Sequence, residues 1–155
     1  MQTFLPYPDF AATAAVLDTA RLGKQRVEAM MILRYLRGLY RFGSWRNHPA
    51  TLMWRGYEDA LRVYLYQMIR EWTRRGHKNT IRVRLPAGFA SGATPMPWWL
   101  GDERLHSSHR AALLYKNYEW YSRFGWTETP ALDYFWPVRA KDQAAAEPPG
   151  SGTLP

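Results

Sequence analysis

A single glutamate among arginines and lysines is the feature of this sequence that most suggests chemistry. Glu28 is the only acidic residue between Arg21 and Arg41, a stretch that also holds Lys24 and Arg26. A basic helix face attracts phosphates, and a lone carboxylate weakens that attraction. One interpretation is that Glu28 performs chemistry on a nucleic acid held by the basic residues. The other is an i,i+4 ion pair with Lys24, which needs no function.

The α-amine of Met1 is a second group that can do chemistry. An α-amine is a weaker base than a lysine side chain, so a good fraction of it is neutral at physiological pH. A neutral amine can attack C1′ of a sugar and form an imine. The sequence runs from Met1-Gln2 directly into the predicted fold. Since every protein has such an amine, the sequence alone gives it no role.

Histidines and tryptophans supply weaker candidates. His106 and His109 are spaced i,i+3 on a predicted helix and can present two metal ligands, but no third ligand is marked nearby. We therefore expect surface histidines or phosphate contacts at these positions. Trp98 and Trp99 can stack on unpaired bases or close a core under a long loop, and both interpretations stay open. With no cysteine and no phosphate-binding loop, neither a metal nor an organic cofactor is expected.

Composition and charge indicate a globular protein with an anionic partner. The chain has 155 residues, a net charge of +8 and 46% hydrophobic residues. Residues 1–84 carry 15 Lys and Arg against 6 Asp and Glu, whereas residues 85–155 carry 6 against 7. A basic half of this strength is typical of binding to nucleic acid or to an anionic membrane surface. No transmembrane or secretory segment is recognisable, which predicts a cytoplasmic, nucleoid-associated protein.

The elements that must position these groups are predicted to be helices. The expected helices span residues 9–17, 18–40, 49–75 and 102–116. Asp9, Asp18 and Pro49 are typical of helix starts, and Gly43 and Gly76 of helix ends. The fold class is therefore all-α: a compact single domain of three to four helices with long loops.

The remaining segments are expected to be extended or irregular. Pro6 and Pro8 keep the first eight residues extended. Residues 77–101 are rich in Gly and Pro, and a weak alternation over residues 80–85 allows a short strand. We expect a helical domain over residues 1–139, followed by a disordered tail over residues 140–155.

One carboxylate of the third predicted helix falls on its apolar side. Glu58 lies within the stripe that includes Trp54, Leu61 and Leu65. A buried carboxylate must be paired or protonated. Glu58 is therefore predicted to be an internal salt-bridge partner or a second carboxylate of the site.

Three stretches in order resemble the pyrimidine-dimer DNA glycosylases, the small phage-type endonuclease V enzymes that incise UV-damaged DNA. The first is Leu17-Asp18-x-x-Arg21-Leu22, followed by Glu28. The second is Asn47-His48, leading into a long helix that ends EWTRRGH. The third is WYSRFG, which begins Trp120-Tyr121. The resemblance covers roughly residues 1–125 and implies a divergent bacterial member with the phage endonuclease V-like fold.

The resemblance also implies a mechanism and a partner. Family members are bifunctional glycosylase/AP lyases whose N-terminal amine attacks C1′ of the damaged nucleotide. It implies the Met1 amine as nucleophile, with Gln2 beside it, and Glu28 as the group that stabilises charge and moves protons. The partner would be double-stranded DNA with a damaged or modified base, bound by a monomer. The DNA contacts so implied are Arg21, Lys24, Gln25, Arg26, Arg46, Asn47, His48, Trp120 and Tyr121.

Several positions depart from the family pattern. Arg21 stands where the family has histidine, and Val27 and Met31 stand where it has arginines. Gln2 is bulky, so Met1 is expected to be retained. The substrate can therefore be a pyrimidine dimer or another modified pyrimidine. A DNA- or RNA-binding module without catalysis, and an interaction domain whose charge serves only solubility, are the alternatives.

Overall fold

The computed structural model describes residues 1–138, and every regular element in this part of the chain is helical. The α-helices are α1 Phe10–Val16, α2 Thr19–Leu36, α3 Pro49–Leu52, α4 Glu58–Arg74, α5 Glu103–Lys116 and α6 Tyr118–Tyr121. Two 3-10 turns, η1 Ser44–Asn47 and η2 Ser122–Phe124, complete them. The all-α prediction is confirmed. The strand allowed at residues 80–85 is not formed, and the predicted tail from residue 140 lies outside the described residues.

Local sequence sets the ends of the helices. The Asp9 carboxylate accepts a hydrogen bond from Ala12 N at 2.7 Å and so caps α1. Helix α2 ends at Leu36, four residues before the predicted end, because Gly38 takes up a left-handed conformation with φ +74°. The amide of Leu39 then bonds back to Arg34 O at 3.0 Å, which is the Schellman arrangement.

The third predicted helix is broken into two pieces. After α3 the chain turns through Gly56, whose φ of +84° a side-chain-bearing residue rarely adopts, and α4 begins at Glu58. The prediction for Glu58 was therefore wrong: it is half-exposed in the first turn of α4, and its carboxylate accepts a bond from Gly56 N at 3.2 Å. It belongs neither to the core nor to the site described below.

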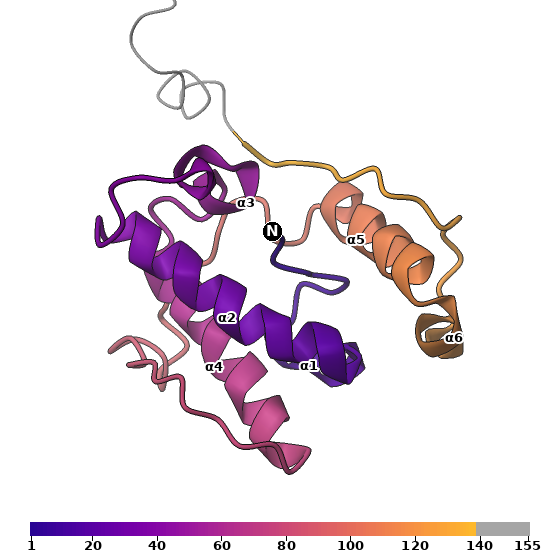
Figure 1. Cartoon of the computed structure of the whole chain (residues 1–155), viewed down its shortest axis with the longest axis horizontal. Coiled ribbons are helices and arrows are strands. Elements are labelled where there is room, and N and C mark those ends of the chain that lie inside the picture. The colour runs from indigo at the N-terminus through magenta and orange to yellow at the C-terminus, as the bar shows by residue number, and fades with distance from the viewer. Residues whose placement is uncertain (139–155) are drawn as a thin grey trace, which may run out of the picture.

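Helices α1, α2 and α4 pack together as one layer, and α5 with α6 stands apart from them on the other side of the molecule (Figure 1). Trp54, Tyr64 and Trp99 are fully buried large residues in the single hydrophobic core. The two adjacent tryptophans of the sequence separate, since Trp99 donates to Met53 O whereas Trp98 is about half exposed. Trp99 therefore closes the core, whereas base stacking by Trp98 stays a prediction.

The first residues run as an extended segment between the two helical layers (Figure 1). This extended segment, residues 2–6, is called the N-terminal strand; it pairs with no β-strand in the described part of the chain, and side chains satisfy its backbone. Phe4 bonds through N and O to Gln25 on α2 and Tyr64 on α4. Leu5 bonds through N and O to α5. Alternation along an extended strand thus lets one segment join both layers.

The segment after η2 returns across the molecule toward α3 (Figure 1). Its rings form a series of edge and tilted contacts in which Trp136 touches His48 and Tyr134, and Tyr134 touches Phe4 and His109. This segment therefore covers the N-terminal strand from the side opposite α2. None of the helices in the described part of the chain combines the length and apolarity needed to span a membrane.

Candidate active site

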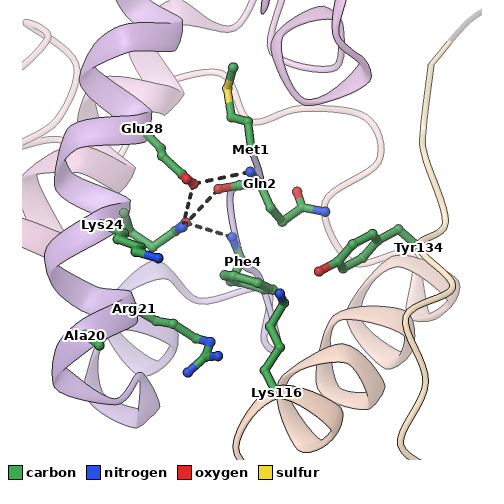
Figure 2. Close-up of a pocket in the computed structure, with 10 residues that line it drawn as sticks. Met1, Gln2, Phe4, Ala20, Arg21, Lys24, Glu28, Lys116 and Tyr134 are labelled. Atoms are coloured by element: carbon green, nitrogen blue, oxygen red, sulfur yellow. Dashed lines mark hydrogen bonds between the residues drawn. The ribbon is translucent and has the colours of Figure 1, made fainter.

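A cavity of about 310 Å³ opens where the N-terminal strand meets α2. Its lining comes from the strand, the first three turns of α2, the end of α5 and the returning segment. The lining residues are Met1, Gln2, Phe4, Ala20, Arg21, Lys24, Gln25, Glu28, Lys116 and Tyr134. Figure 2 shows Glu28 and the backbone of Gln2 facing each other in this cavity.

The Glu28 carboxylate contacts the start of the chain and does not pair with Lys24, one turn earlier on α2. Its Oε2 accepts from Gln2 N at 3.2 Å and from Gln25 Nε2 at 3.1 Å. Within residues 1–138 no ion pair joins it to Lys24, so the interpretation as an i,i+4 pair was wrong. The carboxylate therefore lies beside the N-terminal backbone in the wall of the cavity.

Gln25 holds this arrangement together from the interior. Its side-chain amide accepts from Phe4 N at 2.9 Å and from the Tyr64 hydroxyl at 2.7 Å. The same amide donates to Gln2 O at 2.9 Å and to Glu28. Gln25 is 1% exposed. Since its side chain is buried and these bonds are internal, the geometry favours a positioning role in place of the predicted DNA contact.

Three cationic side chains surround the cavity. Arg21 and Lys24 project from α2, and Lys116 reaches in from the end of α5 (Figure 2). Arg21 also pairs with Asp18 at 3.2 Å. The Asp18 side chain accepts no capping hydrogen bond from the first turn of α2, and Asp18 N donates to the Tyr121 hydroxyl at 3.0 Å. A cavity with one carboxylate and three cations suits a phosphate-bearing ligand.

Burial and the charges around this site shift the pKa values of His48 and Tyr134. Burial lowers the pKa of His48, and the positive charge of the chain's N-terminus lowers it further. Burial raises the pKa of Tyr134, with opposing influences from Arg21 and Glu28. Both shifts keep the side chains uncharged at neutral pH. His48 Nδ1 meanwhile accepts from Ala50 N at 3.0 Å and caps α3.

An apolar groove lies on the other side of Glu28. Its lining residues are Thr19, Ala20, Gly23, Lys24, Val27, Glu28, Met31, Trp45 and Trp72. Glu28 and Lys24 belong to both hollows. The groove wall depends on Gly23, because a Cβ there would come within 3.1 Å of the Trp72 ring. Val27 and Met31, which replace arginines of the family pattern, make this side apolar.

The other residues predicted to contact DNA fall into two groups. Arg46, Asn47 and His48 lie on or next to η1, away from the core, and Arg46 is exposed. Arg26 instead lies 4.2 Å over the Trp72 ring and donates to Asn79 at 2.6 Å, so its guanidinium is engaged within the protein.

The aromatic pair near the end of the resemblance is structural in its contacts. Tyr121 is fully buried and its hydroxyl bonds to Asp18, and burial strongly raises its pKa. Trp120 donates to Val16 O at 2.8 Å and lies under Arg123. Tyr121 in particular has no exposed surface for a DNA contact, in contrast to its predicted role.

The sequence did not predict that Lys116 and Tyr134 line the cavity or that two histidines of α5 are buried. Lys116 and Tyr134 line the cavity although nothing near them in sequence marks them. His106 and His109 were expected at the surface, but both are 0% exposed and bond to Leu5. The i,i+3 spacing correctly placed these two histidines on one face of α5, and only the tertiary packing shows that this face is internal. Within residues 1–138, no three His, Cys, Asp or Glu side chains gather where they could hold a metal.

Comparison with known proteins gives one match. A protein-family model described as pyrimidine dimer DNA glycosylase matches residues 1–85, which is more than half of the chain. The matched segment contains the N-terminal strand, α1 to α4 and Glu28. No curated protein and no solved structure matches the chain.

Proposed function

Since this chain belongs to the pyrimidine dimer DNA glycosylase family, we propose that it removes a damaged pyrimidine from double-stranded DNA and then cleaves the strand as an AP lyase. The observation that carries the proposal is the contact between Glu28 Oε2 and Gln2 N at 3.2 Å, at the wall of a cavity ringed by cations. A carboxylate and the start of the chain in contact are the two groups this chemistry needs.

The proposed reaction proceeds through an imine. The amine nitrogen attacks C1′ while the bond from C1′ to the base nitrogen breaks, and the base leaves with a proton. The C1′–O4′ bond then opens, which leaves the nitrogen doubly bonded to C1′. Loss of a C2′ proton expels the 3′ phosphate by β-elimination, and water releases the amine. The Glu28 carboxylate stabilises the cationic sugar and relays the protons.

Two nitrogens are candidates for the nucleophile. In the intact chain we assign this role to the Met1 amine, because Met1 lines the cavity and the N-terminal charge acts on His48. Gln2 N is then an amide and cannot attack. If Met1 is cleaved, Gln2 N becomes a primary amine already in contact with Glu28. The intact mass of the protein distinguishes the two forms.

The cations and the groove would hold the DNA. Arg21, Lys24 and Lys116 bind phosphates flanking the lesion. Enzymes that act on bases take them out of the stack. The apolar groove beside Glu28, with Trp45 and Trp72 in its wall, offers apolar surface to an unpaired base.

The Glu28→Gln substitution tests the catalytic assignment. We expect strand cleavage of UV-irradiated duplex to fall at least about a hundredfold, because loss of one preorganised electrostatic group costs that much in comparable sites. Duplex affinity should change by less than about threefold. Glu58→Gln, a half-exposed glutamate away from both hollows, is the matched control. Unchanged cleavage by Glu28→Gln refutes the assignment, and duplex binding by wild type with no cleavage indicates a non-catalytic module.

A further inference from the structure

His106 and His109 form hydrogen bonds with the two backbone polar groups of Leu5 in the N-terminal strand. His109 Nδ1 accepts from Leu5 N at 2.8 Å, and His106 Nδ1 lies 2.7 Å from Leu5 O. The two histidines are one turn apart on α5 and fully buried, as is Leu5. Both polar backbone groups of a buried residue are thus satisfied by imidazoles.

The hydrogen bonds fix a different tautomer on each ring. Gly101 N donates to His106 Nε2 at 2.9 Å, so the proton of His106 is on Nδ1 and is given to Leu5 O. His109 accepts at Nδ1, so its proton is on Nε2. That Nε2 is buried and has no hydrogen-bond partner among residues 1–138. Because an orphaned buried donor is costly, an apolar side chain would serve packing alone better than His109 does.

Further hydrogen bonds connect the position of Leu5 to that of the N-terminal end of the chain. From Leu5 back to Gln2 the strand is about 10 Å long at about 3.3 Å per residue. Along it, Gln25 bonds to Phe4 N and Gln2 O, and Glu28 bonds to Gln2 N. Beyond Leu5, Arg110 donates to Pro6 O at 2.9 Å. The strand cannot slide along its axis without breaking these bonds together.

We propose that His106 and His109 are positioning residues for the N-terminal nucleophile, which set the register of the strand and hence the place where the amine meets C1′. This inference rests on the proposed function. It assigns a role in the reaction to α5, which lies outside the residues matched by the family model. A displacement of the reacting atoms by about 1 Å can cost about a hundredfold in rate, so the register of the strand bears directly on catalysis.

Two substitutions of His109 separate positioning from packing. The Oδ1 of Asn occupies the place of His Nδ1 and can accept from Leu5 N, whereas Leu fills similar space without an acceptor. On abasic duplex, we expect His109→Leu to slow single-turnover imine trapping with borohydride at least about tenfold, with the Kd for that duplex within about twofold. His109→Asn should recover most of the rate. His106→Asn, which keeps a donor for Leu5 O, should likewise lose less than His106→Leu.

A readout independent of activity keeps the two proposals separable. Hydrogen exchange of the peptide that contains residues 1–8 should speed up in His109→Leu and stay near wild type in His109→Asn. A folded His109→Leu protein with wild-type trapping overturns the inference, as does equal slowing in the Leu and Asn variants. If wild type itself forms no adduct, the proposed function fails. In that case, unchanged hydrogen exchange in His109→Leu would also refute the claim that His109 holds the N-terminal strand in place.

Discussion

Gln25 is the residue on which the relation between strand and helix depends. One amide group contacts Gln2, Phe4, Glu28 and Tyr64, so it fixes the strand, the carboxylate and α4 at once. Burial strongly raises the pKa of Tyr64, and the nearby Glu28 charge adds to this effect, so the hydroxyl keeps its one proton, which is shared between Gln25 Oε1 and Phe4 O. Two neutral side chains, Gln25 and Tyr64, therefore position the strand next to the Glu28 carboxylate.

His109 makes stability depend on pH. Its pKa falls from the usual 6.5 to about 3 because it is buried, with the His106 charge as a smaller cause. The folded state therefore binds fewer protons than the unfolded state between these values, so the free energy of unfolding falls as the pH drops from about 6.5 toward 3. His106 shifts in the same direction through burial.

We expect His109→Asn to have a shallower pH dependence than wild type over pH 4–6, by about one proton taken up on unfolding. Urea unfolding at several pH values measures it. Carboxylates that titrate in the same range are common to both proteins, so the difference isolates His109. Parallel stability curves would contradict the burial of a neutral imidazole.

At the scale of elements, α2 presents two surfaces that meet at Glu28. One is the cation-lined cavity against the strand, and the other is the apolar groove that reaches Trp45 on η1. Because the groove would act on the base and the cavity on the sugar, substitutions in the groove should affect the two half-reactions unequally.

Trp45→Ala tests this division. We expect cleavage of UV-irradiated duplex to fall about tenfold, since loss of a stacking ring costs about 1–3 kcal/mol per base. Cleavage of a duplex with a ready-made abasic site should change by less than about twofold, because no base need be held there. Tyr118→Ala removes an exposed ring of α6 outside the groove and serves as control. Equal losses on the two substrates would exclude a role in holding the base.

The helices followed from local sequence where caps and periodicity agree. Asp9 and Asp102 mark real boundaries, whereas α2 ends before Gly38 and not near the predicted Gly43. The break at Gly56 was missed because the apolar stripe continues past it. Glu28 could be singled out from charge alone, but its contact with Gln2 could not, because the N-terminal strand has no periodic pattern and is satisfied by side chains.

The roles of residues outside the matched segment could not be predicted from the sequence, because they depend on tertiary contacts. The burial of His106 and His109 depends on a strand that lies about a hundred residues earlier in the chain. No local rule distinguishes a buried i,i+3 pair of histidines from an exposed one. Lys116 and Tyr134 reach the cavity only because α5 and the returning segment pack over that strand.

At the scale of the whole molecule, positive charge is concentrated in residues 1–84. Beyond the cavity and the apolar groove, Arg41, Arg46 and Arg55 line a third hollow beside Phe42, which is 89% exposed. Exposed arginines next to an exposed ring are suited to a phosphate backbone and a wedge between bases. We therefore expect the DNA footprint to extend from the cavity past η1.

Salt dependence of duplex binding tests that footprint. We expect Arg46→Gln to reduce the slope of log K against log salt by about one, since one phosphate contact is lost. Arg104→Gln, which removes an exposed arginine paired with Asp102 on α5, should leave the slope unchanged. Equal slopes for wild type and Arg46→Gln would remove η1 from the interface.

The proposed function depends on one step, in which the N-terminal amine forms an imine with DNA beside Glu28. The most direct measurement is borohydride trapping with UV-irradiated, abasic and undamaged duplexes, using protein with a native, untagged N-terminus, followed by mass mapping of the adduct. We predict an adduct with the first two duplexes, carried by Met1 or, after its removal, by Gln2, and lost when the amine is blocked. An adduct mapped to a lysine, or no adduct with any duplex despite binding, would contradict the account.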